Sequence, residues 1–512
     1  MTGARAPPGA VLDRISGDSR LTCMTSSAGG QATATIAGRA MVWPLALAQF
    51  IASYAATNMN VSISAIAEDI NTTVFGLQTA ITLFTLTMAS LMIPGSKLSD
   101  ILGRKACFMG GLIVYGIGAL LAALAPNLGV IIIGYSVLEG VGSALMIPPI
   151  YILVTVWFAD LKTRAKYFGL VSGAGGLGAA AGPLIGGMVT SAISWRASFL
   201  LQVLVIVWII FLARKIIDPG IEGKKPSFDV FGAILSALAL FSIVLGILLS
   251  RTYGWLGARE DFVIGDTVII PQGGISPVWV FIAIGALILL WFFTHVRSLE
   301  RTGREPLLHL RMFANRTANL GLGTQTIQWL VMQGSFFVIS VYLQEVRGFN
   351  AIETGLMLTP TTAGILLASV AAERFARRHP QRWLVIAGFL ATTIGMALLL
   401  LLVREDSSVF TFLPGLFLMG VGLGTMLTSS VNIVQSSFPD ADQGEISGLS
   451  RSVSNLGSSL GTAWAGSVLV AVALPGGESF GVALITLAVF SVIGLVLSVL
   501  IPGRKGKAGP PA

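Results

Sequence analysis

Two charged side chains interrupt long apolar stretches of this sequence, and each could do chemistry there. Glu139 lies in residues 131–150, IIIGYSVLEGVGSALMIPPI, a run with no other charge, and Arg451 lies near one end of a second run. An ionised carboxylate inside a membrane is costly, so such an acid is usually kept for a function. Glu139 is therefore our candidate for reversible proton binding. The alternative is a protonated acid that only holds two helices together. We expect Arg451 to extend to the membrane surface.

Uncharged polar side chains form the second group of candidates, because polar groups in apolar segments usually face the protein interior. A cavity lined by amides and aromatic rings, with little charge, suits lipophilic small molecules, including cations. Some of these amides are expected to serve only as contacts between helices. The candidates are Gln49, Asn58, Asn60, Gln78, Gln202, Gln325, Gln328, Trp329, Gln333, Asn432 and Gln435.

Two short motifs stand apart from the apolar runs. In SKLSDILGRK, residues 96–105, Asp100, Gly103, Arg104 and Lys105 could form a cytoplasmic gate; the alternative is a solvated basic turn. In GLGAAAGPLIGG, residues 176–187, the small residues allow helices to approach closely, and the proline bends the helix. This second motif predicts a packed pivot, or simple close packing, at Gly178, Gly182, Pro183, Gly186 and Gly187.

Patterns typical of enzymes and nucleotide-binding proteins are missing. The run GAGGLG, residues 173–178, matches a dinucleotide-binding pattern by letters but does not follow a strand. No Walker A, HExxH or CxxC motif occurs, and we expect His295, His309 and His379 to be solvated in loops. The sequence therefore predicts neither an enzyme nor a metal or cofactor site. Any uphill transport would draw on a proton gradient.

The composition is that of an all-α integral membrane protein. Of 512 residues, 54% are hydrophobic and 11% charged, with a mean hydropathy of +0.83, whereas soluble domains carry about 25% charged residues. A span needs about 20 mostly apolar residues, and fourteen such runs are found. They lie near 41–66, 74–95, 106–125, 129–154, 167–192, 197–213, 230–250, 276–294, 317–344, 354–372, 383–403, 408–436, 446–473 and 480–502.

Basic residues predict the orientation, because cytoplasmic loops are enriched in lysine and arginine. With both termini in the cytoplasm, that side holds all of the 32 lysines and arginines except five, which are Arg196, Arg251, Arg259, Arg347 and Arg404. The net charge of +8 is then explained by topology, so no nucleic-acid partner is expected. The predicted location is the plasma membrane, in contact with lipid, as a monomer.

Spacing divides the chain into two similar halves. We predict a disordered cytoplasmic tail at 1–40, a six-helix bundle at 41–218, a linker with two extra helices at 219–313, a second six-helix bundle at 314–502 and a tail at 503–512. The loop at about 251–275 could form a small hairpin. Repeated halves are typical of secondary transporters, which bind substrate between the halves near the membrane midplane.

These motifs resemble the major facilitator superfamily, in particular its fourteen-span drug:proton antiporter branch. The likeness covers roughly residues 41–502 and includes KLSDILGRK, GLGAAAGPLIGG, WRASF (195–199) and SGLSRSVSNLGSSLGTA (447–463). It implies that Asp100 and Arg104 latch the two halves on the cytoplasmic side. It also implies that the glycine motif tightens the contact between halves and disfavours leak.

The sequence departs from this family at two positions commonly linked to proton coupling. Ala55 stands where the family usually has an Asp, and Ser136 where it usually has an Arg. Glu139 occupies the position of a usual Gln, which leaves it as the candidate for proton coupling. The leading interpretation is a proton-coupled exporter of drugs or lipophilic natural products, with antibiotic resistance as its consequence. The alternatives are an uncoupled facilitator or lipid/metabolite exporter, and a membrane sensor that transports nothing.

Overall fold

The computed structural model describes residues 41–158, 161–216, 227–264, 267–376, 379–404, 406–439, 442–471 and 478–502. Within these ranges the chain is helical apart from one small hairpin. The predicted tails at 1–40 and 503–512, and residues 219–226 of the predicted linker, lie outside the described residues.

The first group of helices runs from residue 41 to α8. Short polar residues begin two of them: Thr73 and Ser194 accept the backbone N–H of Gly76 and Ala197, which satisfies donors that a helix start leaves open. Gly103 has φ 103° and joins α3 to α4, in a conformation that glycine adopts at little cost. The elements are helix 41–61, α2 (Ile63–Asp69), α3 (Val74–Leu102), α4 (Arg104–Ala123), α5 (Leu128–Ile131), the π-helical η1 (Ile132–Glu139), α6 (Gly140–Trp157), α7 (Leu161–Ala192) and α8 (Trp195–Ala213).

The second group of helices follows the two extra ones. Asn350 and Glu353 form a reciprocal capping box at the start of α12, and Asn315 caps α11. The elements are η2 (Leu310–Ala314), α11 (Arg316–Val341), the π-helical η3 (Tyr342–Val346), α12 (Ala351–Met357), α13 (Thr359–Ala376), α14 (Gln381–Leu402), η4 (Val409–Thr411), α15 (Leu413–Gln435), α16 (Gln443–Ala471) and α17 (Glu478–Leu500).

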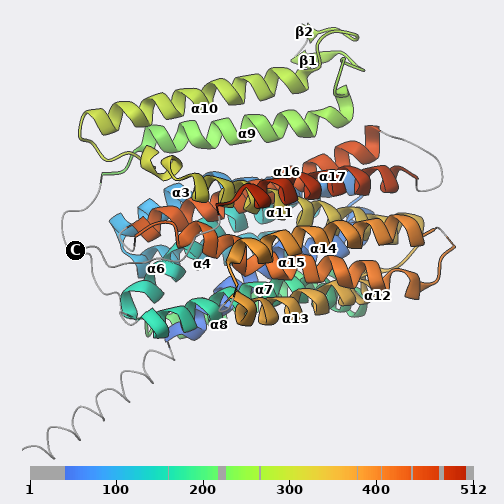
Figure 1. Ribbon diagram of the computed structural model, residues 1–512. Coiled ribbons are helices and arrows are strands. Elements are labelled where there is room, and N and C mark those ends of the chain that lie inside the picture. Colours follow the sequence, from blue (N-terminus) through green and yellow to red (C-terminus); the bar gives the residue numbers. More distant parts are fainter. Residues whose placement is uncertain are drawn as a thin grey trace, which may run out of the picture.

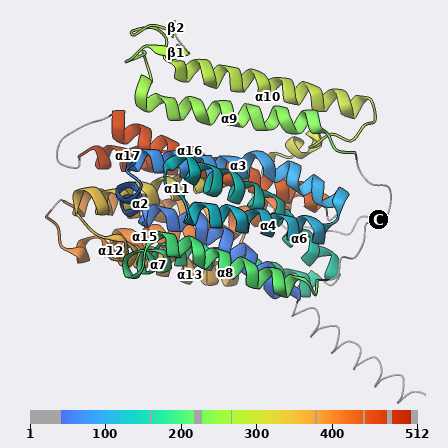
Figure 2. The ribbon, with the colours of Figure 1, turned by 180° about the vertical axis from the view of Figure 1, so that it is seen from behind.

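Between the groups lie α9 (Val230–Tyr253), β1 (Phe262–Ile264), β2 (Thr267–Ile270) and α10 (Pro277–Arg301), and the two strands pair antiparallel as the predicted hairpin. Figures 1 and 2 show α9 and α10 along one side of the other helices. α9 contacts both groups, because the Arg251 guanidinium donates to the Phe75 carbonyl at 2.8 Å and Ser467 Oγ donates to the Ile247 carbonyl at 3.1 Å. The pair therefore covers the line where α3 of the first group meets α16 of the second.

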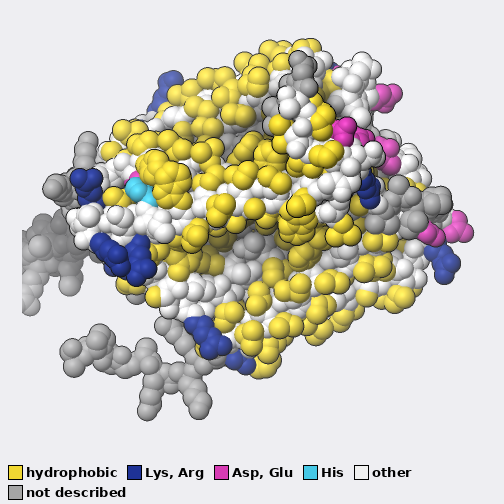
Figure 3. All heavy atoms as spheres, turned by 90° about the horizontal axis from the view of Figure 1, so that it is seen from above, with side chains coloured by type: hydrophobic (Ala, Val, Ile, Leu, Met, Phe, Trp, Pro, Cys, Tyr) yellow, Lys and Arg dark blue, Asp and Glu magenta, His cyan; other side chains and the backbone are white. Residues whose placement is uncertain are grey.

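The surface of this helix pair is suited to lipid. Figure 3 shows apolar side chains over its middle and charged side chains towards its two ends. On α10, Trp279, Leu287, Leu290 and Trp291 are exposed. Large exposed apolar areas on a soluble protein would mark an interface, whereas on a membrane helix they are the lipid-facing side.

Twelve helical segments of the described residues are long and apolar enough to cross a membrane. The predicted spans at 41–66 and 446–473 are not among the twelve, although helix 41–61 and α16 occupy those positions. α16 is rich in serine because its polar side faces protein: Ser452 Oγ donates to the Ala89 carbonyl at 2.5 Å and Ser459 Oγ to the Thr82 carbonyl at 3.0 Å. These serines lower the hydropathy of α16 although they lie buried against α3.

The two groups meet along two seams. α3 packs on α16 in one of them, and α7 packs on α12 and α13 in the other. Gly187 of α7 lies directly against the Ala351 carbonyl of α12, and Gly355 of α12 lies against the Pro183 carbonyl of α7. A side chain at either glycine would collide with backbone, so small residues are required for this contact.

We call the end of the helices that carries β1 and β2 the hairpin end. The opposite end, which carries the α3–α4 turn at Gly103, is called the basic end.

Candidate functional site

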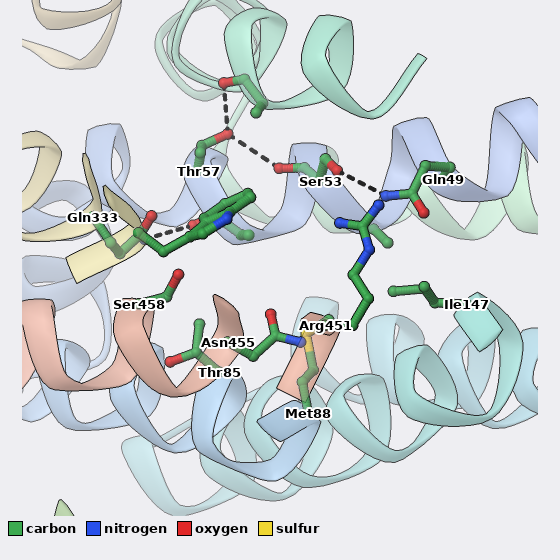
Figure 4. A pocket seen from close by; sticks show the side chains of 14 residues that line it. Gln49, Ser53, Thr57, Thr85, Met88, Ile147, Gln333, Arg451, Asn455 and Ser458 are labelled. Carbon is green, nitrogen blue, oxygen red and sulfur yellow. Dashed lines mark hydrogen bonds between the residues drawn. The ribbon is translucent and has the colours of Figure 1, made fainter. Parts of the chain in front are cut away.

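A small polar pocket of about 40 Å³ lies between the two groups of helices (Figure 4). Helix 41–61, α3, α6 and α7 line it from the first group, and α11 and α16 from the second. A drug-sized ligand needs roughly 300 Å³ or more, so the pocket must widen to hold one. The lining residues are Gln49, Ala52, Ser53, Ala56, Thr57, Thr85, Met88, Ile147, Ala179, Trp329, Gln333, Arg451, Asn455 and Ser458.

Three of the predicted cavity residues, Gln49, Trp329 and Gln333, line this pocket. Gln333 also bridges the halves, because its Nε2 donates to the Ala56 carbonyl at 2.9 Å. Gln49 Nε2 donates to Ser53 Oγ at 3.3 Å. These amides therefore combine pocket lining with contacts that hold its wall.

Arg451 lies in the pocket wall and not at the membrane surface, which corrects the sequence-based expectation. Figure 4 shows its side chain extending from α16 into the pocket. The guanidinium donates to the Tyr151 hydroxyl and lies 5.1 Å from the centre of that ring. The Tyr151 hydroxyl in turn lies 3.4 Å from Gln49 Oε1. Among the described residues no carboxylate pairs with Arg451. The sequence could not reveal this, because the packing of α16 against its neighbours decides which of its residues face the pocket.

Four of the other eight predicted amides hold helices together outside the pocket. Gln325 Nε2 donates to Ser454 Oγ at 2.8 Å, Gln328 Oε1 accepts from Ser430 Oγ at 2.7 Å, and Gln78 Nε2 donates to a carbonyl of α16. Gln202 bonds within the first group. The remaining ones, outside the pocket lining, are Asn58, Asn60, Asn432 and Gln435.

Glu139 is fully buried, at 0% exposure, and lies outside the pocket lining. It ends η1, a π-helical segment, and such segments are rare and frequent at functional sites. Sequence pattern does not reveal a π-turn, since the apolar run continues through it unchanged. Of the described residues, Tyr115 places its hydroxyl beside the Glu139 carboxyl group as a hydrogen-bonding neighbour. The nearby Tyr115 hydroxyl donates to Gln202 Oε1 at 2.6 Å.

The two positions where the sequence departs from the family, Ala55 and Ser136, both lie at η1. The Tyr135 hydroxyl donates to the Ala55 carbonyl at 3.3 Å, and Ser136 Oγ donates to the Ala80 carbonyl at 2.8 Å. Tyr135 and Ser136 belong to η1, as does Glu139. A tyrosine hydroxyl and a serine hydroxyl thus tie the π-helical segment to helix 41–61 and α3, one turn before Glu139.

The glycine motif of α7 faces two different neighbours. Gly178, Gly182 and Gly186 pack against Phe50, Thr57 and Asn58 of helix 41–61, within the first group. Only the Pro183–Gly187 part contacts α12 across the seam, supported by a hydrogen bond from the Ile352 N–H to Ser191 Oγ at 2.9 Å. The middle of the motif also contacts the second group, because Thr362 Oγ1 of α13 donates to the Ala180 carbonyl at 2.9 Å.

At the basic end, the predicted gate residues surround the α3–α4 turn. Asp100 is half-buried beside the charges of Arg104 and Lys97. Lys97 pairs with Glu305 at 3.2 Å, and Lys105 Nζ donates to the Arg214 carbonyl at the end of α8 at 3.0 Å. Lys97, which the sequence analysis did not select, thus joins this turn to the segment between α10 and η2.

At the hairpin end, side-chain hydrogen bonds join the halves. Gln344 is central: its Oε1 accepts the Ser64 N–H at 3.2 Å and its Nε2 donates to the Asn60 carbonyl at 3.0 Å. Ser64 Oγ also donates to Glu345 Oε1 at 3.0 Å. Gln344 and Glu345 were not sequence candidates, because an amide and an acid near a helix end look like ordinary surface residues.

Two of the histidines expected to be solvated are paired. His295 lies 2.9 Å from Asp229 and joins α10 to the start of α9, and His309 lies 3.0 Å from Glu445 and joins the segment before η2 to α16. In the part of the chain that the structure describes, His, Cys, Asp and Glu do not gather into a group of three that could hold a metal ion.

Two groups of membrane-spanning helices with a polar pocket between them are the architecture of a secondary transporter. The chain belongs to the Major Facilitator Superfamily, whose sequence pattern matches residues 45–323, 233–462 and 321–512. The resemblance seen in the motifs is thereby confirmed at the level of the family.

The sequence is similar to those of several curated proteins, three of which are described here. It is 25% identical over 396 residues to the multidrug resistance protein Stp of Mycobacterium tuberculosis, covering 77% of this chain and 69% of that protein. It is 26% identical over 419 residues to the puromycin resistance protein pur8 of Streptomyces alboniger, covering 81% and 78%. It is 26% identical over 480 residues to the cephamycin export protein CmcT of Amycolatopsis lactamdurans, covering 90% and 92%.

Proposed function

We propose that this protein exports lipophilic drugs or natural products across the cell membrane. The observation that carries the proposal is the polar pocket that both groups of helices line, in a chain whose relatives are named for drug resistance and export. The protein performs no catalytic reaction in this proposal and acts as a monomer surrounded by lipid.

The proposed topology has fourteen spans with both termini in the cytoplasm. The twelve apolar segments are joined by helix 41–61 and α16. The distribution of lysine and arginine supports this orientation, which makes the hairpin end extracellular and the basic end cytoplasmic. The proposed division remains two bundles, 41–218 and 314–502, separated by the linker with α9 and α10.

Transport in this proposal proceeds by alternating access, with the two bundles rocking about the pocket. The extracellular side is held closed by the hydrogen bonds of Gln344 and Ser64 and by the Pro183–Gly187 contact with α12. Each hydrogen bond contributes only about 0.5–1.5 kcal/mol. A few such bonds can hold one state and still be exchanged for substrate contacts.

We further propose that Glu139 couples export to the proton gradient, with no bound cofactor. Its carboxyl group is fully buried, with the Tyr115 hydroxyl beside it, so its ionised form is costly. Loss and gain of its proton would therefore favour different arrangements of η1 against α4 and α8. The geometry also supports a second candidate, uncoupled transport, because Glu139 lies outside the pocket and Ala55 and Ser136 replace the family's usual charged residues.

Uphill efflux separates the two candidates. Cells that lack their own efflux pumps are loaded with a neutral fluorescent dye, and export is followed before and after a protonophore. Coupled export stops when the gradient collapses, whereas uncoupled transport only equalises the dye. Glu139→Gln, which cannot ionise, is compared with Glu260→Gln, which removes an exposed acid at the hairpin end. Retained uphill export in Glu139→Gln would exclude Glu139 as the coupling site.

A further inference from the structure

The pocket carries one positive charge that nothing in its wall neutralises. Of the fourteen residues that line it, Arg451 alone is charged. Its partner is the Tyr151 hydroxyl, which is neutral, and no carboxylate of the described residues pairs with it. A guanidinium stays protonated at every physiological pH and offers five N–H donors in a planar fork. The donors that Tyr151 does not use can face the pocket.

An unpaired charge in a low-dielectric site selects the charge of its ligand. Opposite charges attract and like charges repel much more strongly at such a site than in bulk water, because the effective dielectric constant is lower. Arginine binds a carboxylate through two parallel hydrogen bonds, which adds geometric specificity. The site therefore favours an anion and disfavours the cations that the sequence analysis included among the substrates.

The rest of the wall suits the apolar body of such an anion. Ala52, Ala56, Met88, Ile147 and Trp329 supply apolar and aromatic surface. Gln49, which lies beside the end of the Arg451 side chain (Figure 4), and Gln333 are neutral amides that can donate to an oxygen-rich ligand.

We propose that this pocket takes lipophilic organic acids, with the carboxylate bound by Arg451 and the ring system held against the apolar wall around Trp329. This inference rests on the proposed export function and names its substrate class. The competing structural role is that Arg451 only joins α16 to α6 through Tyr151. In that role the charge of the ligand would not matter.

Binding to the purified full-length protein tests the assignment. The probes share one ring system: 1-pyrenebutyric acid, its methyl ester and 1-pyrenebutylamine, with affinities measured by fluorescence anisotropy at pH 7.5. The wild type should bind the acid at least tenfold more tightly than the amine. In Arg451→Gln the acid should lose that preference while the ester changes by less than about threefold. Arg451→Lys should keep part of the preference, because a charge remains without the fork.

The matched control is Arg404→Gln, which removes the same charge from an exposed position and should leave all three affinities unchanged. Equal or tighter binding of the amine, no binding of the acid, or a preference that survives in Arg451→Gln would overturn the proposal. Displacement of the acid by phosphatidylglycerol but not by phosphatidylcholine would assign the anion to a lipid headgroup and overturn the organic-acid assignment. Export of the neutral dye in cells is measured separately, so failure of acid selectivity is distinguishable from failure of export.

Discussion

Glu139 and Arg451 are the two charged residues inside the predicted spans, and the structure places them in opposite settings. Glu139 is fully enclosed within the first group of helices, whereas Arg451 is only partly buried and lines the pocket between the groups. Glu139 lies beside the Tyr115 hydroxyl, and Arg451 is held by the Tyr151 hydroxyl. We infer from this comparison that the two residues have separate roles: Glu139 binds and releases protons, and Arg451 contacts the substrate.

The largest expected effects are the separate losses of proton coupling and of acid binding in two variants. Glu139→Gln should abolish uphill export, a loss of more than tenfold, while leaving binding of 1-pyrenebutyric acid within about twofold of the wild type. Arg451→Gln should leave uphill export of the neutral dye intact. It should weaken binding of 1-pyrenebutyric acid about tenfold, which corresponds to about 1.4 kcal/mol. Transport in proteoliposomes with an imposed pH gradient and equilibrium binding are measured on the same preparations. If both variants lose both properties, the two residues do not have separate roles.

A smaller effect concerns Tyr151, which orients Arg451. Tyr151→Phe keeps the ring that the guanidinium lies against but removes the hydroxyl. Acid binding should weaken by about threefold, roughly 0.7 kcal/mol, as expected for one lost hydrogen bond. Binding of the methyl ester serves as the control and should not change. Equal weakening of both ligands would indicate general damage to the pocket wall.

Stability distinguishes a functional acid from a structural one at Glu139. A buried polar group whose hydrogen bonds are incompletely satisfied costs about 1–3 kcal/mol, so Glu139→Met should raise the thermal unfolding temperature of the detergent-solubilised protein by a few degrees. The same variant should not export uphill. A fall in unfolding temperature would show instead that the acid holds helices together, which is the alternative weighed from the sequence. Arg451→Met, at a partly buried site, is the matched variant and should change the unfolding temperature little.

The smallest effect is expected at an exposed ion pair that serves as a baseline. Asp69, the last residue of α2, bonds to Arg196 at the start of α8. That hydrogen bond lowers the pKa of Asp69. Because the pKa is lowered, the ion pair contributes to stability at pH values above the pKa of aspartate in the unfolded chain, about 3.9. This contribution to stability is lost as the pH falls further.

Between pH 5.5 and 8, therefore, Asp69→Asn should leave the pH profile of transport unchanged and lower stability by less than about 1 kcal/mol. Transport rates at several pH values, compared with those of Glu139→Gln, provide the check. A changed profile in Asp69→Asn would mean that the exposed pair, and not only the buried acid, takes part in proton coupling.

Several features of this protein follow from the sequence by itself. Apolar runs of about 20 residues are typical of membrane-spanning helices, so the helical class and most of the spans were predictable from composition. The positions of Glu139 and the α7 glycines were also predictable, because a charge in an apolar run and small residues four apart are local patterns. The motifs carried the family assignment, which the match over residues 45–323, 233–462 and 321–512 confirms.

Only the tertiary structure decided which of these residues meet. Arg451 lines a pocket because α16 crosses the line between the halves at that depth, facing Tyr151 of α6. Gln325 and Gln328, of the same type as Gln333 and on the same helix, turn instead to serines of α16 and α15. The direction of a side chain around a helix is set by the packing of its neighbours, and residue type and spacing do not contain that information.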